Sequence, residues 1–492
     1  MRRIVGPALL SALCCGATQA ADRAPHPAEP RSAVPGQTVR GWVTSADHSR
    51  EMQGVQAPLE PATDAPAAIE VDPTRRYQTM VGFGATITDS SAWLIRSRMD
   101  GAQRTALMQD LFGPAPGLQI SFVRLTIGAS DFSLAQYSLD DVPLGESDPG
   151  LEHFSIAPIR GTVVPVVQEA LALNPSLEVM ASPWSAPAWM KSSGALVQGT
   201  LLPQFYGAFT NYLVKYVEAM NAEGIPIFAL TVENEPEYEP ATYPGMPLEA
   251  SDRAQLIGSY LGPALAGRKP RTLIMEWDHN WILPEEPLQV LADPAAAPYV
   301  AAVAWHCYKG KVTAQTEVHL AHPEKDAYMT ECTGGDWETP ANPALLSMTR
   351  DLIIGSTRGW ARGVLFWNLA LDESNGPHLG GCGKCRGLVT IDSHTGEVRR
   401  NPEYYVIAHA SRFVRPGAQR IESNDTDGGL ANVAFRNQDG SMVLIAANSA
   451  TTPRELLVRC RDREYRYTMP ERSVATFVWT QDDADLHPRP TQ

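Results

Sequence analysis

Short apolar segments alternate with helical segments from about residue 77 to residue 405. Between the apolar segments, a stretch such as "LPQFYGAFTNYLVKYVEAMNAEG" has apolar residues at helical spacing. A run of about eight strands that alternate with helices predicts a (β/α)8 TIM barrel over residues 77–405. The segments that we expect to form its strands are "VGFGATIT", "FVRLTIG", "LEVMASPW", "IFALTVENEP", "RTLIMEW", "VAWHCY", "AYMTECT" and "VLFWNLAL".

A second pattern begins near residue 406. The segments "LANVAFRNQDGSMVLIAANSA" and "SVATFVWT" read as strands joined by turns, which predicts a small β domain over residues 406–482. The early strand "VRGWVTS", in the segment 37–76, is expected to join the same sheet. The predicted fold is therefore an α/β barrel with a β-sandwich side domain, which the C-terminal region and an N-terminal strand form together.

The two ends of the chain carry different signals. Residues 1–20, "MRRIVGPALLSALCCGATQA", have the charge pattern of a signal peptide, with cleavage near Ala20. Their apolar run is shorter than the roughly 20 residues of a membrane span, so stable membrane insertion is not expected. Residues 21–36, rich in Pro and Ala, and residues 483–492 are expected to be a disordered linker and tail. We therefore expect a secreted or periplasmic protein.

Net charge and cysteine content limit the partners and cofactors that the protein could have. The net charge of −15 argues against a nucleic-acid partner, because an acidic surface repels phosphates. The "CGKC" motif of Cys382 and Cys385 could be half of a zinc site with His378, a redox pair or a local disulfide. A second CxxC is absent and the expected compartment is oxidising, so we favour the disulfide and expect no metal or cofactor. The pairing of three other cysteines stays open: Cys307, Cys332 and Cys460.

Carboxylates and aromatic residues follow the predicted strands, as in "SDFS", "SPWSAPAW", "ENEPEY" and "TECTGGDW". The chemistry of such a barrel lies at these strand ends. Two carboxyl groups beside aromatic rings are what cleavage of a sugar acetal requires. Glu331 ends the seventh strand, and either Glu233 or Glu235 ends the fourth. The residues alone do not distinguish the last two, because positions two apart in a strand face the same way.

Six motifs together resemble a known family. In this order, "GFGATITDSSAW", "VRLTIGASDFS", "SPWSAPAWMK", "ENEP", "TEC" and "FWNLALDESNGP" are similar to glycoside hydrolase family 30, which includes the glucosylceramidases. The resemblance extends from "VTSADHS" to "NPEYYVIAHASRFVRPGAQRI". It implies a retaining β-glycosidase of clan A in which Glu235 is the acid/base and Glu331 the nucleophile. The two carboxyl groups should then lie about 5–5.5 Å apart.

The resemblance also implies roles for residues around the two glutamates. A group is expected to bind the sugar: Asp131, Trp184, Asn234, Tyr308 and Trp367. Another group is expected to support the catalytic pair, although Arg124 could also be a plain core salt bridge and His306 a plain core residue: Arg124, His306 and Glu233. Trp189 and Trp337 could line the cleft or only pack, while Glu237 and Glu239 are expected on an exposed loop.

The substrate has two readings within this class. We favour a β-glucosidase of the glucosylceramidase type, which would act on a glycolipid or β-glucoside and place the protein in carbohydrate and sphingolipid metabolism. The alternative is an endo-β-1,6-glucanase, because "GGCGKCRG" resembles microbial members that cut β-1,6-glucan and is absent from lysosomal glucosylceramidases. A protein that binds carbohydrate without catalysis is a third possibility. The oligomeric state is not predicted.

Overall fold

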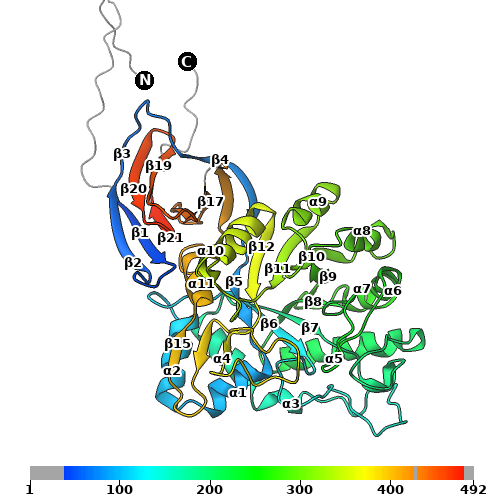
Figure 1. The fold of residues 1–492 in the computed structure, drawn as a ribbon. Coiled ribbons are helices and arrows are strands. Elements are labelled where there is room, and N and C mark those ends of the chain that lie inside the picture. Colours follow the sequence, from blue (N-terminus) through cyan, green and yellow to red (C-terminus); the bar gives the residue numbers. More distant parts are fainter. Residues whose placement is uncertain (1–37, 426–428, 481–492) are drawn as a thin grey trace, which may run out of the picture. The chain divides into compact units, whose positions relative to one another are not determined.

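The computed structural model describes residues 38–425 and 429–480 (Figure 1). The predicted signal peptide with its cleavage near Ala20, the linker 21–36 and the tail 483–492 lie outside the described residues. Within the described ranges, no helix is both long enough and apolar enough to cross a membrane.

The eight predicted strands form a closed barrel within the described chain, and all of its neighbouring strands are parallel. The strand order around the barrel is β5-β6-β7-β8-β9-β10-β11-β12, which closes on β5, as in Figure 1. This confirms the predicted barrel. Its strands are β5 (Gly82–Thr86), β6 (Phe122–Ile127), β7 (Glu178–Pro183), β8 (Ile227–Thr231), β9 (Leu273–Asn280), β10 (Val300–His306), β11 (Asp326–Glu331) and β12 (Ala361–Phe366).

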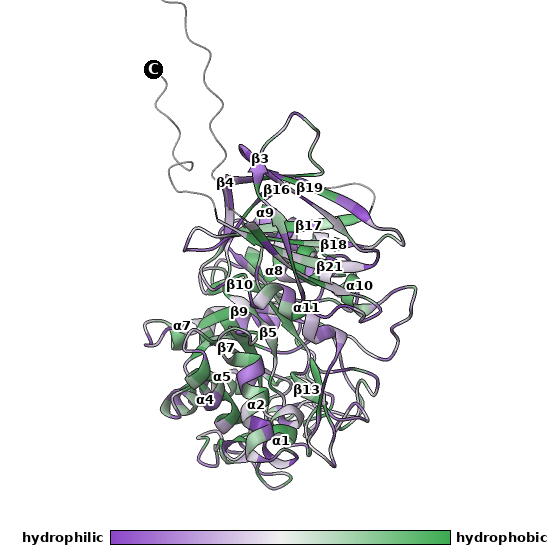
Figure 2. Cartoon of the chain, turned by 90° about the vertical axis from the view of Figure 1, so that its left-hand side faces the viewer, coloured by the Kyte–Doolittle hydropathy of each residue, from purple (hydrophilic) through white to green (hydrophobic). Residues whose placement is uncertain are grey.

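Helices follow the barrel strands and cover the barrel (Figure 1). Helix α4, with the sequence "VVPVVQEALAL", is largely apolar and is green in Figure 2. Helix α2 begins at Asp100, which forms a capping box with Gln103. The helices are α1 (Asp89–Ser97), α2 (Gly101–Phe112), α3 (Ala157–Arg160), α4 (Val163–Leu173), α5 (Tyr206–Ala222), α6 (Ala250–Leu256), α7 (Gly262–Leu265), α8 (Glu285–Ala292), α9 (Thr313–Ala321), α10 (Ala344–Met348) and α11 (Pro402–Ser411), with 3-10 turns η1 (Ala188–Met190) and η2 (Pro203–Phe205) and π-helical turns η3 (Ile257–Leu261) and η4 (Thr349–Ser356).

The barrel interior has an apolar layer and a polar layer. The apolar layer is a buried cluster of Phe122, Met180, Ala229, Met275, Ala302, Ala304, Tyr328 and Leu365. Residues two apart in a strand point to the same side, so the next inward position along each strand lies above this layer. On five strands that position is polar and buried: Arg124, Ser182, Thr231, His306 and Thr330. The alternation of inward positions along the strands thus places a layer of buried polar side chains directly above the apolar core.

The side domain is one sheet of ten strands within the described residues, in the order β2-β1-β21-β18-β17-β16-β4-β19-β20-β3. The early strand pairs with the last one, with Trp42 opposite Thr476, which confirms that the N-terminal segment joins this domain. The predicted boundary after residue 405 falls inside helix α11. The strands are β1 (Thr38–Ser45), β2 (Gln53–Pro58), β3 (Glu60–Pro61), β4 (Ile69–Thr79), β16 (Gln419–Ser423), β17 (Leu430–Arg436), β18 (Met442–Asn448), β19 (Arg454–Cys460), β20 (Arg463–Met469) and β21 (Ser473–Trp479), and a separate small sheet holds β13 (Ala370–Leu371), β14 (Val389–Ile391) and β15 (Val398–Arg400).

A buried histidine joins helix α11 to this sheet. His409 Nδ1 lies 2.9 Å from Thr476 Oγ1, and His409 Nε2 lies 2.9 Å from Thr44 Oγ1. The Thr476 hydroxyl donates to the His409 carbonyl oxygen, so it accepts from Nδ1–H and leaves Nε2 to accept from Thr44. This arrangement needs the neutral imidazole. Burial, with a smaller effect of the Arg412 cation, lowers the pKa of His409 to about 3.

The state of His409 predicts how stability depends on pH. The pKa falls from an ordinary 6.5 to about 3 in the folded protein, so its stabilising contribution is present above pH 6.5 and is lost toward pH 3. Between about pH 7.5 and pH 5, wild type should therefore lose about 2 kcal/mol of unfolding free energy relative to a His409→Gln variant. Urea unfolding of both proteins at the two pH values measures this difference. A difference that is equal at both pH values contradicts a buried neutral histidine.

Candidate active site

Asp278, near the end of β9, accepts hydrogen bonds from five side chains of the polar layer. Asp278 and its cationic partner Arg124 are both fully buried. Burial raises the pKa of Asp278, but Arg124 and the other donors outweigh it, so the pKa lies below its ordinary value. The donors to Oδ2 are Arg124 Nη2 at 2.7 Å, Ser182 Oγ at 2.7 Å and Thr231 Oγ1 at 2.9 Å, and those to Oδ1 are His306 Nε2 at 3.1 Å and Thr330 Oγ1 at 2.6 Å.

Glu331, the last residue of β11, is held by two neighbours of this layer. Arg124 Nη1 donates to Glu331 Oε2, and the Tyr308 hydroxyl donates to Oε1 at 2.9 Å. Arg124 also donates to Asn234 Oδ1 at 2.7 Å. Each oxygen of Glu331 therefore has a fixed donor, which sets the orientation of the carboxylate.

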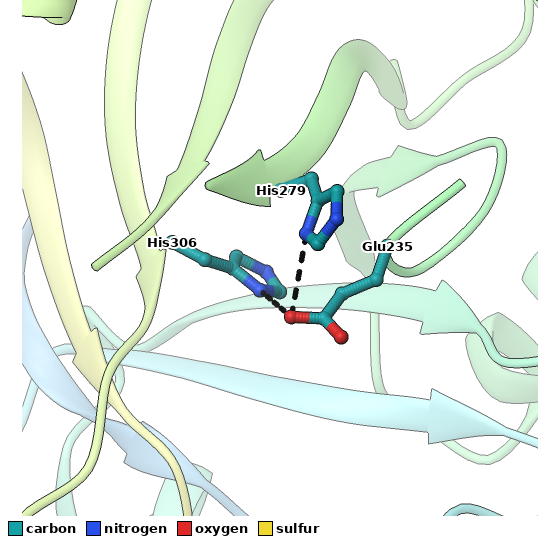
Figure 3. Close-up of side chains that lie close together, drawn as sticks. All are labelled: Glu235, His279 and His306. Carbon is teal, nitrogen blue, oxygen red and sulfur yellow. Dashed lines mark hydrogen bonds and ion pairs between the residues drawn. The ribbon is translucent and has the colours of Figure 1, made fainter. Parts of the chain in front are cut away.

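Glu235 lies on the loop after β8 and faces two histidines (Figure 3). Its Oε1 lies 3.0 Å from His306 Nδ1 and 3.4 Å from His279 Nδ1. Burial raises the pKa of Glu235, but both histidines outweigh it and lower the pKa below its ordinary value. Burial opposes protonation of His306, yet Glu331, Asp278 and Glu235 raise its pKa to about 9. His306 is therefore protonated on both ring nitrogens at neutral pH, with Nδ1–H toward Glu235 and Nε2–H toward Asp278.

A cavity of about 340 Å³ opens above the polar layer. It brings together both candidate glutamates and the whole predicted sugar-binding group. Trp184 and Trp367 stack in its wall with ring centroids 5.0 Å apart, and the Arg124 guanidinium lies 4.7 Å from the Trp184 ring. Burial, Glu331 and Glu235 raise the pKa of Asp131 well above its ordinary value. The lining residues are Asp131, Trp184, Asn234, Glu235, Tyr238, Tyr243, Tyr308, Glu331, Thr333, Trp337, Trp367, Gly381, Cys382 and Cys385.

Glu233 and Glu235 do not face the same way, contrary to the strand-parity argument. Strand β8 ends at Thr231, and Glu235 has a left-handed backbone with φ of 51°, so strand alternation does not extend to it. Glu233 is fully buried, does not line the cavity, and its carboxylate makes no hydrogen bond within the described chain. Burial raises its pKa well above the ordinary value. A supporting role for Glu233 would therefore have to act from outside the cavity.

The remaining sequence expectations have clear positions. Trp337 lines the cavity and is 53% exposed, whereas Trp189 packs against Phe205 and donates to Asp140 Oδ2 at 2.9 Å. Glu237 and Glu239 are exposed, as expected. Sequence reasoning missed Asp278, His279 and the cavity tyrosines Tyr238 and Tyr243. The signal was present for the first two, because "DHN" directly follows the predicted strand "RTLIMEW".

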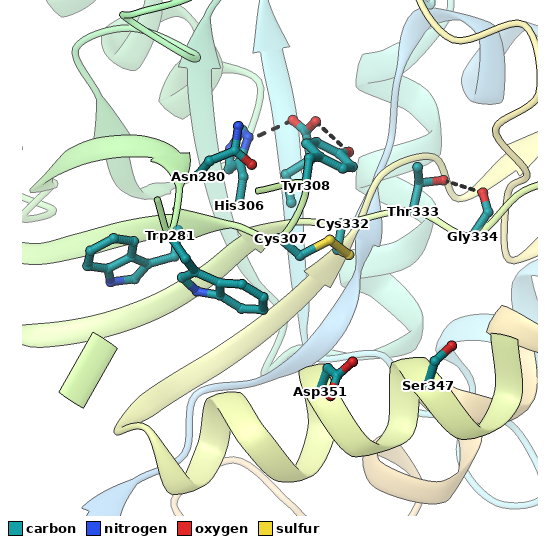
Figure 4. Close-up of a disulfide and its surroundings, with 12 residues drawn as sticks. Asn280, Trp281, His306, Cys307, Tyr308, Cys332, Thr333, Gly334, Ser347 and Asp351 are labelled. Carbon is teal, nitrogen blue, oxygen red and sulfur yellow. Dashed lines mark hydrogen bonds and ion pairs between the residues drawn. A yellow bond between two sulfur atoms is a disulfide. The ribbon is translucent and has the colours of Figure 1, made fainter. Parts of the chain in front are cut away.

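A disulfide between Cys307 and Cys332 connects the ends of β10 and β11 (Figure 4). Cys307 separates His306 from Tyr308, and Cys332 directly follows Glu331. The bridge thus ties together the strand ends that carry these side chains, at a point where the register between β10 and β11 shifts.

The second disulfide is the predicted one between Cys382 and Cys385, and both of its residues line the cavity. It uses both sulfurs of the "CGKC" motif, so neither is available as a zinc thiolate. Cys460 is buried in the side domain and belongs to neither bridge.

The model of the glycosyl hydrolase family 30 TIM-barrel domain matches residues 80–414, and the family 30 β-sandwich model matches residues 417–477. The chain belongs to glycosyl hydrolase family 30. As a family 30 enzyme, it is a retaining β-glycosidase. It is 35% identical over 463 residues to "Endo-1,6-beta-D-glucanase" of Neurospora crassa, with 89% of this chain and 94% of that protein covered.

Two further family 30 relatives represent the two expected substrate types. The chain is 28% identical to "Lysosomal acid glucosylceramidase" of Mus musculus, with 84% of this chain and 83% of that protein covered. The solved structure "The endo-beta1,6-glucanase BT3312" superposes with a TM-score of 0.83 at 32% identity, with 91% of this chain and all of that chain covered.

The Asp278 network predicts a large effect of a small substitution. In Asp278→Asn, the amide NH2 group faces hydrogen-bond donors in either orientation. The substitution also removes the negative charge that compensates Arg124. We expect the free energy of unfolding to fall by about 3–5 kcal/mol, as when one partner of a buried ion pair is removed. Urea unfolding at neutral pH measures it.

The exposed Asp64→Asn variant is the matched control for this measurement and should unfold like wild type. A loss of less than about 1 kcal/mol in Asp278→Asn, the range of an exposed pair, would show that Asp278 does not hold the polar layer together.

Proposed function

We propose that the protein is an endo-β-1,6-glucanase that cuts linear β-1,6-glucan by double displacement. This departs from the glucosylceramidase-type β-glucosidase that the sequence favoured. Identity supports the change, since the chain shares 35% with the Neurospora crassa glucanase and 28% with the mouse glucosylceramidase. The substrate partner would then be a β-glucan rather than a glycolipid.

The observation that carries the proposal is the position of the "GGCGKCRG" segment. Gly381, Cys382 and Cys385 form a wall of the cavity, and Leu379 N donates to the Asp131 carbonyl oxygen at 2.7 Å. A Cβ atom at Gly381 would lie 2.7 Å from Asp131 Oδ2, so this segment packs directly on a predicted sugar-binding carboxyl. The segment that resembles β-1,6-glucan-cleaving members thus shapes the pocket itself.

Two exposed aromatic rings at the rim of the cavity support a sugar as the group bound there. Tyr238 is 48% exposed and Trp337 is 53% exposed, and both line the cavity. Exposed aromatic rings with a polar edge are suited to stacking on sugar faces.

We assign the first chemical step to Glu331 and Glu235. Glu331 attacks the anomeric carbon while Arg124 and Tyr308 hold its two oxygens, and a covalent glycosyl-enzyme forms. Glu235 protonates the departing oxygen. Glu331 is the largest of the charges that raise the pKa of His306, and it loses its charge when it bonds to the sugar. The His306 proton, 3.0 Å from Glu235 Oε1, is therefore released toward Glu235 as the bond forms.

The second step reverses this proton path. Glu235, now ionised, takes a proton from a water molecule that attacks the anomeric carbon, and Glu331 leaves with its charge restored. Two inversions keep the β configuration. Asn234, fixed by Arg124, faces the same cavity and is suited to hold the sugar 2-hydroxyl.

We also propose that residues 1–20 direct export and are removed. Two disulfides among the described residues support this, because disulfides persist in oxidising compartments.

For domain limits, we propose that the barrel continues to the end of helix α11 rather than to residue 405.

The test of the proposal is product analysis at early times with linear β-1,6-glucan, glucosylceramide in detergent and a short aryl β-glucoside. Wild type should release a series of oligosaccharides from the glucan, since internal cleavage produces fragments of many lengths. Glu331→Gln should reduce this activity by at least about 10³-fold, because loss of the covalent nucleophile removes the first chemical step. Chromatography of the products measures both results.

The control is Glu239→Gln, which changes an exposed glutamate of the same loop and should keep wild-type activity. Glucose as the sole product, or release of glucose from glucosylceramide but none from the glucan, would contradict the endo-glucanase. Glucan binding without turnover by wild type would favour the non-catalytic carbohydrate-binding protein.

A further inference from the structure

Three side chains beside the cavity direct one ligand atom each toward a common point (Figure 3). One ligand atom of each residue lies within 4.8 Å of the other two, and Glu235 Oε1 faces Nδ1 of both histidines. The glutamate oxygen is 3.0 Å from His306 Nδ1 and 3.4 Å from His279 Nδ1. A carboxylate and two imidazoles are a common ligand set for a zinc-type cation.

The separations fit such a cation. With bonds of about 2.0–2.1 Å, two ligands of a tetrahedral zinc ion lie about 3.3–3.5 Å apart. The two glutamate–histidine distances of 3.0 and 3.4 Å are within a few tenths of an ångström of that value. A ligand nitrogen of one histidine lies within 4.8 Å of a ligand nitrogen of the other.

The surroundings of His306 also suit a metal ligand. Its other nitrogen, Nε2, lies 3.1 Å from Asp278 Oδ1, and this carboxylate–histidine contact fixes the ring with Nδ1 toward Glu235. Asn280 Nδ2 lies 3.3 Å from His279 Nδ1, so a bound ion would displace one weak polar contact there.

The site is accessible from the cavity. Glu235 lines the cavity, so an ion and its fourth ligand, a water molecule, can enter from that side. Asp131 and Glu331 also line the cavity, and Arg124 is the cation that contacts Glu331 from below.

We propose that Glu235, His279 and His306 bind a zinc-type divalent cation and that this binding inhibits hydrolysis. The ion occupies the Glu235 oxygen and the His306 nitrogen between which the proton moves, so the leaving group receives no proton. Inhibition rests on the proposed role of Glu235, whereas binding rests on the three ligand atoms alone.

The binding half is tested by calorimetric titration of chelator-treated, full-length protein with Zn²⁺. Wild type should bind one ion at this site. His279→Gln and Glu235→Gln should each weaken binding by about tenfold or more, because even the loss of a group that only supports a ligand costs about 10–100-fold. The control is His394→Gln, whose side chain is 86% exposed, and it should bind like wild type. Thermal unfolding of each variant verifies that it is folded.

Equal affinity of wild type, His279→Gln and Glu235→Gln would overturn the site, as would the absence of any Zn²⁺ binding.

The inhibition half is tested on whichever β-glucoside the enzyme turns over, and the inhibition constant should equal the calorimetric dissociation constant. Zn²⁺ that binds these residues without slowing turnover would overturn inhibition and leave binding intact. If no substrate is turned over, the proposed function fails, and calorimetry still decides the binding half.

Discussion

The buried ion pair of Arg124 and Asp278 determines the geometry of the site. Arg124 reaches Glu331 and Asn234 with the same guanidinium that contacts Asp278. Asp278 in turn holds His306, which contacts Glu235. One candidate catalytic glutamate ends β11 and the other lies on the loop after β8, yet both are positioned through this one pair. Two buried charges are costly to desolvate, and the three hydroxyl donors around Asp278 offset part of that cost.

Five barrel strands supply both the core and the site, because each contributes successive inward positions. On β6, Phe122 belongs to the apolar layer and Arg124 to the polar layer, and on β11 the corresponding pair is Tyr328 and Thr330. Packing in the apolar layer holds the strands in place, and the strands in turn position the polar-layer side chains that donate to Asp278. The Cys307–Cys332 bridge adds a covalent link at the strand ends, where parallel pairing is interrupted by the register shift.

The sequence predicted all eight barrel strands and the pairing of an N-terminal strand with the side domain, because these depend on local apolar patterns. It did not predict features that depend on backbone departures from regular strands. Asp278 was missed because the predicted strand stopped at Trp277, whereas β9 continues to Asn280 through two residues with positive φ, Trp277 and Asp278. Glu233 and Glu235 face different ways for a similar reason, since β8 ends at Thr231 and Glu235 also has a positive φ. Only the family resemblance selected Glu235. The Cys307–Cys332 pairing was not predictable, since it needs the three-dimensional neighbourhood of two strands.

The step that decides the proposed mechanism is the covalent bond between Glu331 and the sugar. It is tested most directly by incubating the protein with a 2-deoxy-2-fluoro-β-glucoside that carries an activated leaving group, followed by peptide mass spectrometry. Fluorine at C2 slows both steps, while the good leaving group speeds only the first, so the glycosyl-enzyme accumulates. If Glu331 is the nucleophile, one fluoroglucosyl group per chain is expected, on the peptide that contains Glu331. The same label on Glu233 or Glu235, or turnover of the reagent with no labelled peptide, would contradict it.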